Sequence, residues 1–166
     1  MSTRTAAVLT VSDSSAWGER ADISGPATAD VLRQNGFRVT YQEIVPDDQA
    51  TIESALVRLS EQVQLVVTTG GTGIAARDVT PEATCTVCEK LLDGISERMR
   101  SEGLQHTPLA VLSRGVCGVR GRSLILNLPG SPSGAVQSLR AVLHILPHAI
   151  DLLAGETGHD DVALGG

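Results

Sequence analysis

The sequence is poor in aromatic side chains. They make up 2% of its 166 residues, as Trp17, Phe37 and Tyr41. A hydrophobic core must therefore be built from aliphatic side chains, which are plentiful because 42% of the residues are hydrophobic. A chain of this length folds as one domain and buries roughly 70% of its unfolded surface without help from disulfides or metal.

Positive charge is also scarce, and this excludes some classes of partner. The 13 Lys and Arg residues against 19 Asp and Glu residues give a formal net charge of −6. Nucleic acids and anionic membranes are bound by basic faces, so neither is an expected partner. No apolar run approaches the ~20 residues of a membrane span.

Cysteine is rare as well. The chain has 3 cysteines, and this odd number favours reduced thiols over a disulfide framework. Residues 1–15 turn polar too soon for the apolar core of a secretory signal peptide. We therefore expect a cytoplasmic protein.

What the chain does have is an alternation of apolar runs and amphipathic stretches. Buried strands are predicted at residues 5–11, 37–45, 65–69 and 123–128. Helices are predicted at residues 26–34, from about 49, at 80–92 and at 132–145, with short helical pieces at 95–104, at 109–113 and up to 153. This order is typical of an α/β fold in which a mostly parallel sheet is covered by helices on both faces, as three α/β/α layers. We expect one domain over residues 1–155 and a flexible tail over 156–166.

Polar residues follow each predicted strand. In open α/β sheets, ligands bind outside the carboxyl ends of the strands. These ends carry, in chain order, Ser12 and Asp13, Asp47 and Asp48, Gly70–Gly73, and Pro129–Pro132. Hydroxyls, carboxylates and glycine turns are therefore expected to meet at one edge of the sheet, where we predict a ligand site.

The loop after the third strand is rich in glycine. Gly70, Gly71 and Gly73 allow backbone amides to approach a ligand closely, and a helix with Thr80 as its predicted N-cap follows. Amides beside a helix N-terminus favour an anion site. The loop has neither the lysine of a Walker A loop nor the spacing of the dinucleotide fingerprint. A tight strand-to-helix turn without a ligand is the alternative.

An aspartate closes this loop. A carboxylate beside a phosphate is repelled unless a cation lies between them, and Mg²⁺ commonly takes one or two carboxylates plus substrate phosphates. Asp78 with Asp47 or Asp48 therefore suits a magnesium–nucleotide site. The alternatives are that Asp78 pairs with Arg77 or caps the next helix, and that Asp47 and Asp48 only begin theirs.

Two further groups of residues are open to interpretation. Arginines suit phosphate because the guanidinium donates two parallel hydrogen bonds, but at a surface they are often only solvated; the candidates are Arg77, Arg114, Arg120 and Arg122. The pair Cys85 and Cys88 lies in a predicted helix with no second pair to complete a zinc site. Two small buried thiols are the favoured interpretation over a zinc or redox role.

Two longer stretches resemble a known family. "TTGGTGIAARDVTPEAT" at 68–84 and "SRGVCGVRGRSLILNLPGSP" at 113–132 are similar to the two signatures of the MogA/MoaB family of molybdenum-cofactor biosynthesis. "VLTVSDSS" near the N-terminus and "VPDD" at 45–48 match as well. The resemblance covers residues 5–153.

The resemblance implies a molybdopterin-binding α/β fold, usually a homotrimer, and a molybdenum-insertion enzyme as a possible partner. In catalytic members the activity is adenylation of molybdopterin by Mg-ATP with release of pyrophosphate, and Asp47 and Asp78 match the aspartates that act there and hold Mg²⁺. The resemblance and the polar residues at the strand ends together predict the contacts with substrate and nucleotide. These are Ser12, Asp13, Gly70, Gly71, Thr72, Gly73, Arg77, Ser113, Pro129, Gly130, Ser131 and Pro132. A MoaB-type protein that only binds or scaffolds molybdopterin is the alternative.

Overall fold

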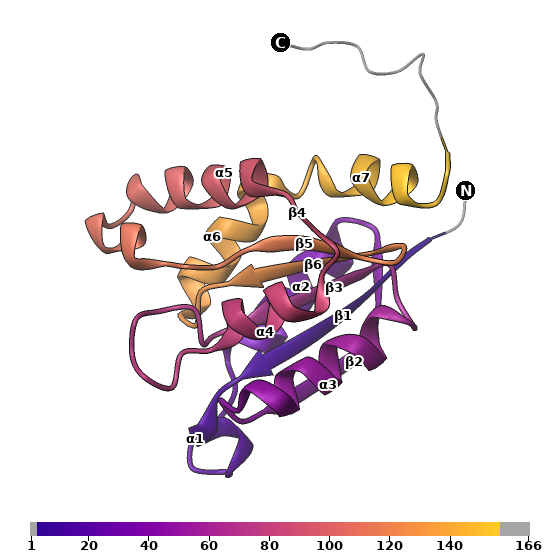
Figure 1. Cartoon of the computed structure of the whole chain (residues 1–166). Coiled ribbons are helices and arrows are strands. Elements are labelled where there is room, and N and C mark those ends of the chain that lie inside the picture. The colour runs from indigo at the N-terminus through magenta and orange to yellow at the C-terminus, as the bar shows by residue number, and fades with distance from the viewer. Residues whose placement is uncertain (1–2, 157–166) are drawn as a thin grey trace.

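Residues 3–156 of the computed structural model are described here, and in them helices cover both faces of one six-stranded sheet (Figure 1). The strands are β1 (Arg4–Val11), β2 (Phe37–Val45), β3 (Leu65–Thr69), β4 (Lys90–Leu91), β5 (Cys117–Arg120) and β6 (Ser123–Leu128). The helices are α1 (Asp13–Ala16), α2 (Ser24–Gln34), α3 (Gln49–Ser60), α4 (Thr80–Val87), α5 (Asp93–Leu104), α6 (Pro132–Val142) and α7 (Leu146–Leu153), with a 3₁₀ helix η1 (Pro108–Leu112). Apart from residue 156, the predicted tail lies outside the described residues.

The sheet is mostly parallel, as predicted. Its strand order is β2-β1-β3-β6-β5-β4, and β2, β1, β3 and β6 run parallel to one another. Strands β5 and β4 complete the sheet in antiparallel pairing. The carboxyl ends of the four parallel strands therefore lie at one edge, where the sequence places its polar residues.

The prediction of one helix over residues 80–92 is wrong in its second half. Helix α4 ends at Val87, and Lys90 and Leu91 instead pair with β5. This pairing depends on Gly118 of β5, where an added Cβ would lie 2.8 Å from the Cβ of Cys88 and 3.0 Å from the carbonyl oxygen of Lys90. The missing side chain lets the segment after α4 lie against the sheet.

The core is aliphatic, as the composition requires. All the largest fully buried side chains are Leu or Ile. Alternate residues of β1 enter opposite sides: Ala6 and Val8 pack with α2 and α6, whereas Ala7 and Leu9 pack with α3 and α4. A parallel strand covered on both faces needs such a continuous apolar run, which is why β1, β3 and β6 were predictable. Strand β2 lies at the edge of the sheet and is mostly exposed, so its prediction depended on alternation instead.

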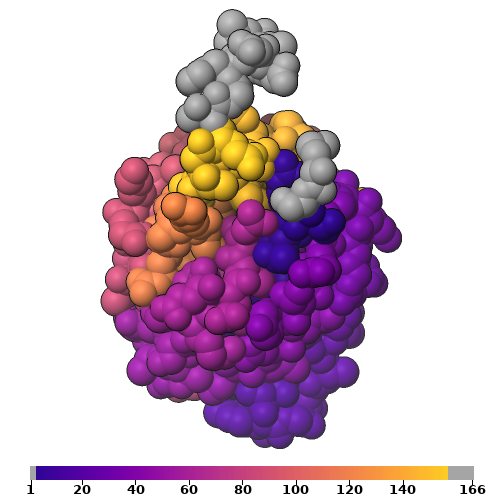
Figure 2. Space-filling view, turned by 90° about the vertical axis from the view of Figure 1, so that its right-hand side faces the viewer, coloured from indigo at the N-terminus to yellow at the C-terminus, as the bar shows by residue number. Residues whose placement is uncertain are grey.

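The three-layer arrangement is confirmed. Helices α3 and α4 cover one face of the sheet, and α2 and α6 cover the other, where α5 and α7 also close the core (Figure 1). Figure 2 shows α7 beside the start of β1, and Arg4 and Asp151 join them with an N–O distance of 2.8 Å. Among the described helices, none combines the length and apolar character that a membrane crossing requires.

Candidate ligand site at the carboxyl edge

A cavity of about 470 Å³ opens at the carboxyl ends of the parallel strands. We call it the carboxyl-edge pocket. The predicted site residues that line it are Ser12, Asp47, Gly70, Gly71, Asp78, Gly130, Ser131 and Pro132. Sequence reasoning missed Thr10, Arg20, Asp22, Ser24 and Thr69, which also line it. Thr10 and Thr69 lie at the ends of β1 and β3, so the strand-end argument could have found them. Arg20, Asp22 and Ser24 lie beyond α1, between it and the start of α2, where this signal does not reach.

Asp47 is held at the pocket by its neighbour Asp13. The Asp13 amide donates to Asp47 Oδ2 and the Asp47 amide donates to Asp13 Oδ1, both at 2.9 Å. Arg77 donates from Nε and Nη2 to the Asp13 carboxylate, at 2.7 and 2.8 Å. These hydrogen bonds from Arg77 keep the pKa of Asp13 below its usual value. Arg77 therefore pairs with Asp13, and the alternative in which it pairs with Asp78 is not the arrangement that the structure has.

The surroundings of Asp47 disfavour its ionised form. Burial raises its pKa above the usual value, and the nearby carboxylates of Asp13 and Asp78 raise it further. The amide of Asp13 and the charge of Arg77 oppose this only in part. A cation placed in the pocket would relieve this cost, because it would favour the ionised form of Asp47.

Asp48 has a different position. Its Oδ2 accepts hydrogen bonds from the Thr51 amide at 3.0 Å and the Thr51 hydroxyl at 2.6 Å, which makes it the N-cap of α3. These bonds lower the pKa of Asp48. Of the two adjacent acids, Asp47 lines the pocket and Asp48 begins the helix. The capping interpretation is therefore confirmed for Asp48, and the magnesium interpretation stays a prediction for Asp47.

Asp78 faces the same pocket from the far end of the glycine loop. Its Oδ2 accepts a hydrogen bond from the Ala75 amide at 2.9 Å, and a Cβ added to Gly73 would lie 2.8 Å from this oxygen. Asp78 does not cap α4, whose N-cap is Val79 without a side-chain hydrogen bond. Asp78 thus closes its own loop and lines the pocket.

Thr80 is not the N-cap that the sequence predicted. It is the first residue of α4, its hydroxyl donates to the Gly70 carbonyl at 3.0 Å and its amide donates to the Gly71 carbonyl at 3.1 Å. Gly70 and Gly71 have φ of +91° and +69°, and added Cβ atoms there would collide with the Val11 carbonyl oxygen and the Thr80 hydroxyl, respectively. Both positions require glycine.

Arg114 holds the rest of the loop. Its amide donates to the Thr72 carbonyl and its Nε donates to the Gly73 carbonyl, both at 2.8 Å. The loop carbonyls are therefore engaged from Gly70 to Gly73. Among the described residues, the amides of Gly71, Thr72 and Gly73 have no hydrogen-bond acceptor. A loop with occupied carbonyls and free amides is suited to an anion.

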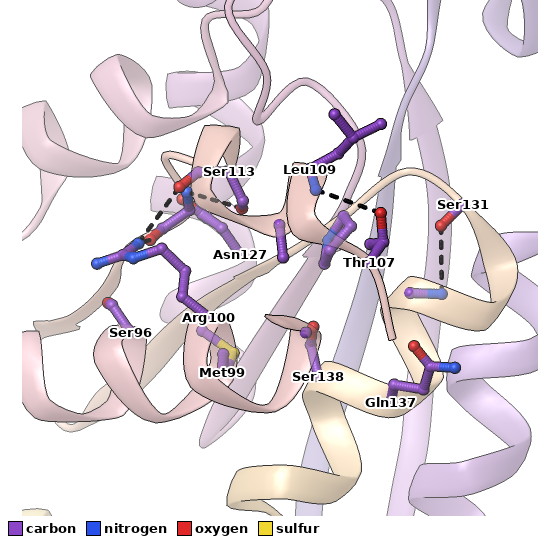
Figure 3. Close-up of a pocket in the computed structure, with 15 residues that line it drawn as sticks. Ser96, Met99, Arg100, Thr107, Leu109, Ser113, Asn127, Ser131, Gln137 and Ser138 are labelled. Atoms are coloured by element: carbon purple, nitrogen blue, oxygen red, sulfur yellow. Dashed lines mark hydrogen bonds between the residues drawn. The ribbon is translucent and has the colours of Figure 1, made fainter. Parts of the chain in front are cut away.

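A second, smaller cavity of about 190 Å³ lies between α5, α6 and η1. We call it the α5–α6 pocket. Figure 3 shows Ser96, Met99 and Arg100 of α5 on one side and Gln137 and Ser138 of α6 on another. The predicted site residues Ser113 and Pro129 line this pocket rather than the carboxyl-edge pocket, and Ser131 lines both. Most of the predicted contacts thus line two adjoining cavities, whereas Asp13, Thr72, Gly73 and Arg77 line neither of them.

Asn127 lies at the inner wall of the α5–α6 pocket and was missed. Its Nδ2 donates to the hydroxyls of Thr68 and Thr84 at 3.1 and 3.0 Å, and its Oδ1 accepts from the Val116 amide at 3.2 Å. The side chain is buried and connects β6, β3 and α4 with the segment before β5. An asparagine inside the apolar run "SLILNL" was the available signal, because a buried amide needs such partners.

Two groups of candidates lie elsewhere. Arg120 and Arg122 flank the β5–β6 turn at the opposite edge of the sheet, so the expectation that they face phosphate is wrong. The expectation of two buried thiols is wrong for Cys85, which is exposed, while Cys88 is half-buried. Within residues 3–156, no group of three or more His, Cys, Asp or Glu side chains could hold a metal ion.

The carboxyl-edge pocket nevertheless has donors that suit Mg²⁺. Oδ1 of Asp47 and Oδ1 of Asp78 accept no hydrogen bond from the described residues, while each Oδ2 is fixed by a backbone amide. Two carboxylate oxygens completed by phosphate oxygens and water are a common magnesium environment. The residues therefore fit a magnesium ion that arrives with a nucleotide.

Fold and site together define an α/β protein with a pocket suited to an anionic ligand at the carboxyl edge of its sheet. The family described as "Probable molybdopterin binding domain" matches residues 7–148. The chain therefore belongs to this family, the MogA/MoaB family of the sequence resemblance.

Individual relatives agree with this membership. The chain is 45% identical over 152 residues to a molybdopterin adenylyltransferase of Helicobacter pylori, covering 89% of this chain and 86% of the relative. It is similar to the structure of the molybdopterin biosynthesis enzyme MoaB from Thermus thermophilus, at 49% identity, TM-score 0.86, and coverage of 92% and 97%. The molybdopterin biosynthesis Mog protein of Mycobacterium ulcerans gives 40% identity, TM-score 0.87, and coverage of 93% and 99%.

Proposed function

We propose that the protein is a molybdopterin adenylyltransferase of molybdenum-cofactor biosynthesis. The terminal phosphate of molybdopterin attacks the α-phosphorus of ATP, the bond to the departing pyrophosphate breaks, and adenylyl-molybdopterin is formed. The observation that carries this proposal is that Gly71, which has a free amide, lines one pocket with Asp47 and Asp78, two carboxylates that each have a free oxygen. The name of the Helicobacter pylori relative supports the same reaction.

The residues of the carboxyl-edge pocket have distinct roles in this proposal. The amides of Gly71, Thr72 and Gly73 bind phosphate oxygens of ATP. Asp47 and Asp78 would hold Mg²⁺, and the bound ion would supply neutralisation of the charge on the phosphate oxygens. Phosphoryl transfer depends mostly on positioning and charge stabilisation, so no enzyme nucleophile is required.

Molybdopterin is assigned to the α5–α6 pocket. Its wall combines apolar side chains with hydroxyl and amide groups. Met99 and Leu109 supply apolar surface, and Ser113, Asn127 and Gln137 supply the polar groups (Figure 3). This mixture suits a flat heterocycle with polar edges. Because Ser131 lines both cavities, a phosphate on the pterin side would meet the nucleotide there.

The test is adenylyl transfer from labelled Mg-ATP to molybdopterin, with a catalytically active relative as positive control. We expect wild-type protein to form adenylyl-molybdopterin and pyrophosphate, and Asp78→Asn to lose turnover while keeping molybdopterin affinity. An inactive wild type beside an active control would overturn the proposal.

A MoaB-type protein that binds molybdopterin without using ATP is the second candidate. The likeness to the MoaB structure of Thermus thermophilus favours it. Titration with Mg-ATP separates the two: molybdopterin binding without magnesium-dependent nucleotide binding would support the MoaB-type function.

The proposal also covers the oligomeric state of the protein, its cellular compartment and its partner. We propose a homotrimer that acts in the cytoplasm and passes its product to a molybdenum-insertion enzyme. Exposed apolar side chains at Leu104, Leu109 and Val111 offer surface for contact between subunits. Sedimentation that gives a monomer of 17.3 kDa would contradict the trimer.

A further inference from the structure

Arg114 spans the loop that carries Asp78. Besides its bonds to Thr72 and Gly73, its Nη2 donates to the carbonyl oxygen of Asp78 at 2.8 Å. One side chain thus connects the carbonyls at both ends of the segment 73–78. Because Arg114 lies 36 residues beyond Asp78 along the chain, these bonds tie the loop to a different part of the fold.

Glu82 orients this guanidinium. Its carboxylate accepts from Nη1 at 2.6 Å and from Nη2 at 3.1 Å, in the two-point geometry that only arginine provides. Glu82 belongs to the first turn of α4. The guanidinium is therefore fixed on both sides, by the helix that follows the loop and by the loop carbonyls.

Segment 73–78 has few other hydrogen bonds to the described residues. Arg77 is exposed and reaches Asp13, and Ala75 and Asp78 bond only to each other within the loop. Without Arg114, the carbonyls of Gly73 and Asp78 would lose their donors among the described residues. Asp78 would then stand on a loop held only at its ends and by the exposed Arg77–Asp13 pair.

We propose that Arg114 is a positioning residue: it fixes the 73–78 loop so that Asp78 and the free loop amides stay aimed into the carboxyl-edge pocket. It need not touch the substrate, because its guanidinium is committed to protein carbonyls and Glu82. This role rests on the proposed function for its effect on turnover, but the holding of the loop can be measured without any reaction.

The first test is amide hydrogen exchange of the unliganded protein over residues 72–80. In Arg114→Met we expect exchange about tenfold faster, since the opening of a loop governs exchange of its amides. The matched control is Arg58→Met, because Arg58 makes a similar two-point pair with Glu43 at 2.7 and 2.9 Å but holds no glycine-loop carbonyl. Unchanged exchange in Arg114→Met would overturn the inference whether or not the protein is an enzyme.

The second test is kinetic. We expect kcat for adenylyl transfer to fall about 100-fold in Arg114→Met, because small misplacements of reacting groups cost that much, while the Kd for molybdopterin changes less than about twofold. Arg114→Lys should not restore kcat, since one ammonium cannot replace the planar fork. Should Arg114→Met fold poorly, Glu82→Gln tests the same idea, with a fall in kcat of about tenfold.

The outcomes separate the two proposals. An active wild type whose Arg114→Met and Glu82→Gln variants keep full turnover would overturn the positioning role alone. An inactive wild type together with faster amide exchange in Arg114→Met would overturn the adenylyltransferase proposal. It would still support the inference that Arg114 holds the loop in place.

Discussion

Replacement of Asp47 by Asn should make the protein more stable and less active. The substitution keeps the shape of the side chain and an oxygen that can accept from the Asp13 amide, but it removes one of three neighbouring negative charges. The carboxylate of Asp47 is disfavoured in the folded protein, chiefly by burial and then by Asp13 and Asp78, which is why its pKa is raised. Removing the charge removes this cost.

The magnitude follows from the size of charge interactions at a partly exposed site. After solvent screening such interactions are typically worth about 1 kcal/mol or less, and we expect the cost that Asp47→Asn removes to be of this size. For a domain of this size we expect Asp47→Asn to raise Tm by about 2–4 °C at pH 7. The folded protein holds the proton of Asp47 more tightly than the unfolded chain, so wild-type stability falls as pH rises from about 4, the usual pKa of an aspartate, through the raised pKa. The advantage of Asp47→Asn should therefore fade toward pH 4.

The assay is thermal unfolding at pH 4 and pH 7, paired with adenylyl transfer, where we expect kcat to fall at least about 100-fold. Asp48→Asn is the matched control, because Asp48 is the adjacent acid but its pKa is lowered by the Thr51 hydrogen bonds at the N-cap of α3. Its substitution should lower Tm at pH 7, the opposite sign. The reasoning is refuted if the Asp47→Asn variant has a lower Tm than wild type at pH 7. It is also refuted if the difference in Tm between variant and wild type does not depend on pH.

Three further perturbations test other parts of the structure. Asn127→Leu should lower the free energy of unfolding by about 2–3 kcal/mol in urea titrations, because it leaves buried partners unpaired; a loss below about 0.5 kcal/mol would contradict this. Gly71→Ala should lower Tm more than Gly36→Ala, since both have positive φ but an added Cβ collides with a neighbour only at Gly71; equal losses would refute the collision. A thiol reagent at pH 8 should modify Cys85 quickly and Cys117 only after unfolding, because burial raises the pKa of the Cys117 thiol to about 12; equally fast modification would show that Cys117 is accessible.

The sequence predicted the parallel strands and the site edge because both leave a local signal. A strand buried on two faces must be apolar throughout, and the polar residues that follow it stand out. Asp47 and Asp78 are such residues, and both line the carboxyl-edge pocket. Strand β4 left no comparable signal, since two residues have no period and their pairing depends on the glycine of a distant strand.

The contacts that hold the site residues in place could not be predicted from the local sequence either. Thr80 looked like a helix cap, and its hydroxyl instead reaches ten residues back to the Gly70 carbonyl. Arg114 looked like a phosphate ligand, and its donors are instead taken by loop carbonyls and Glu82. In both cases the residue type was right for the chemistry, but its partner was set by tertiary packing.

The glycine loop therefore does not bind an anion by virtue of its own four residues alone. Each residue from Gly70 to Gly73 carries a carbonyl that would repel phosphate if it faced the pocket. Thr80 and Arg114 engage these carbonyls on the protein side. With the carbonyls engaged on the protein side, the amides of Gly71, Thr72 and Gly73 are left without acceptors among the described residues, as an anion site requires. The chemistry of the motif is thus decided as much by a threonine in the next helix and an arginine from a distant segment as by its glycines.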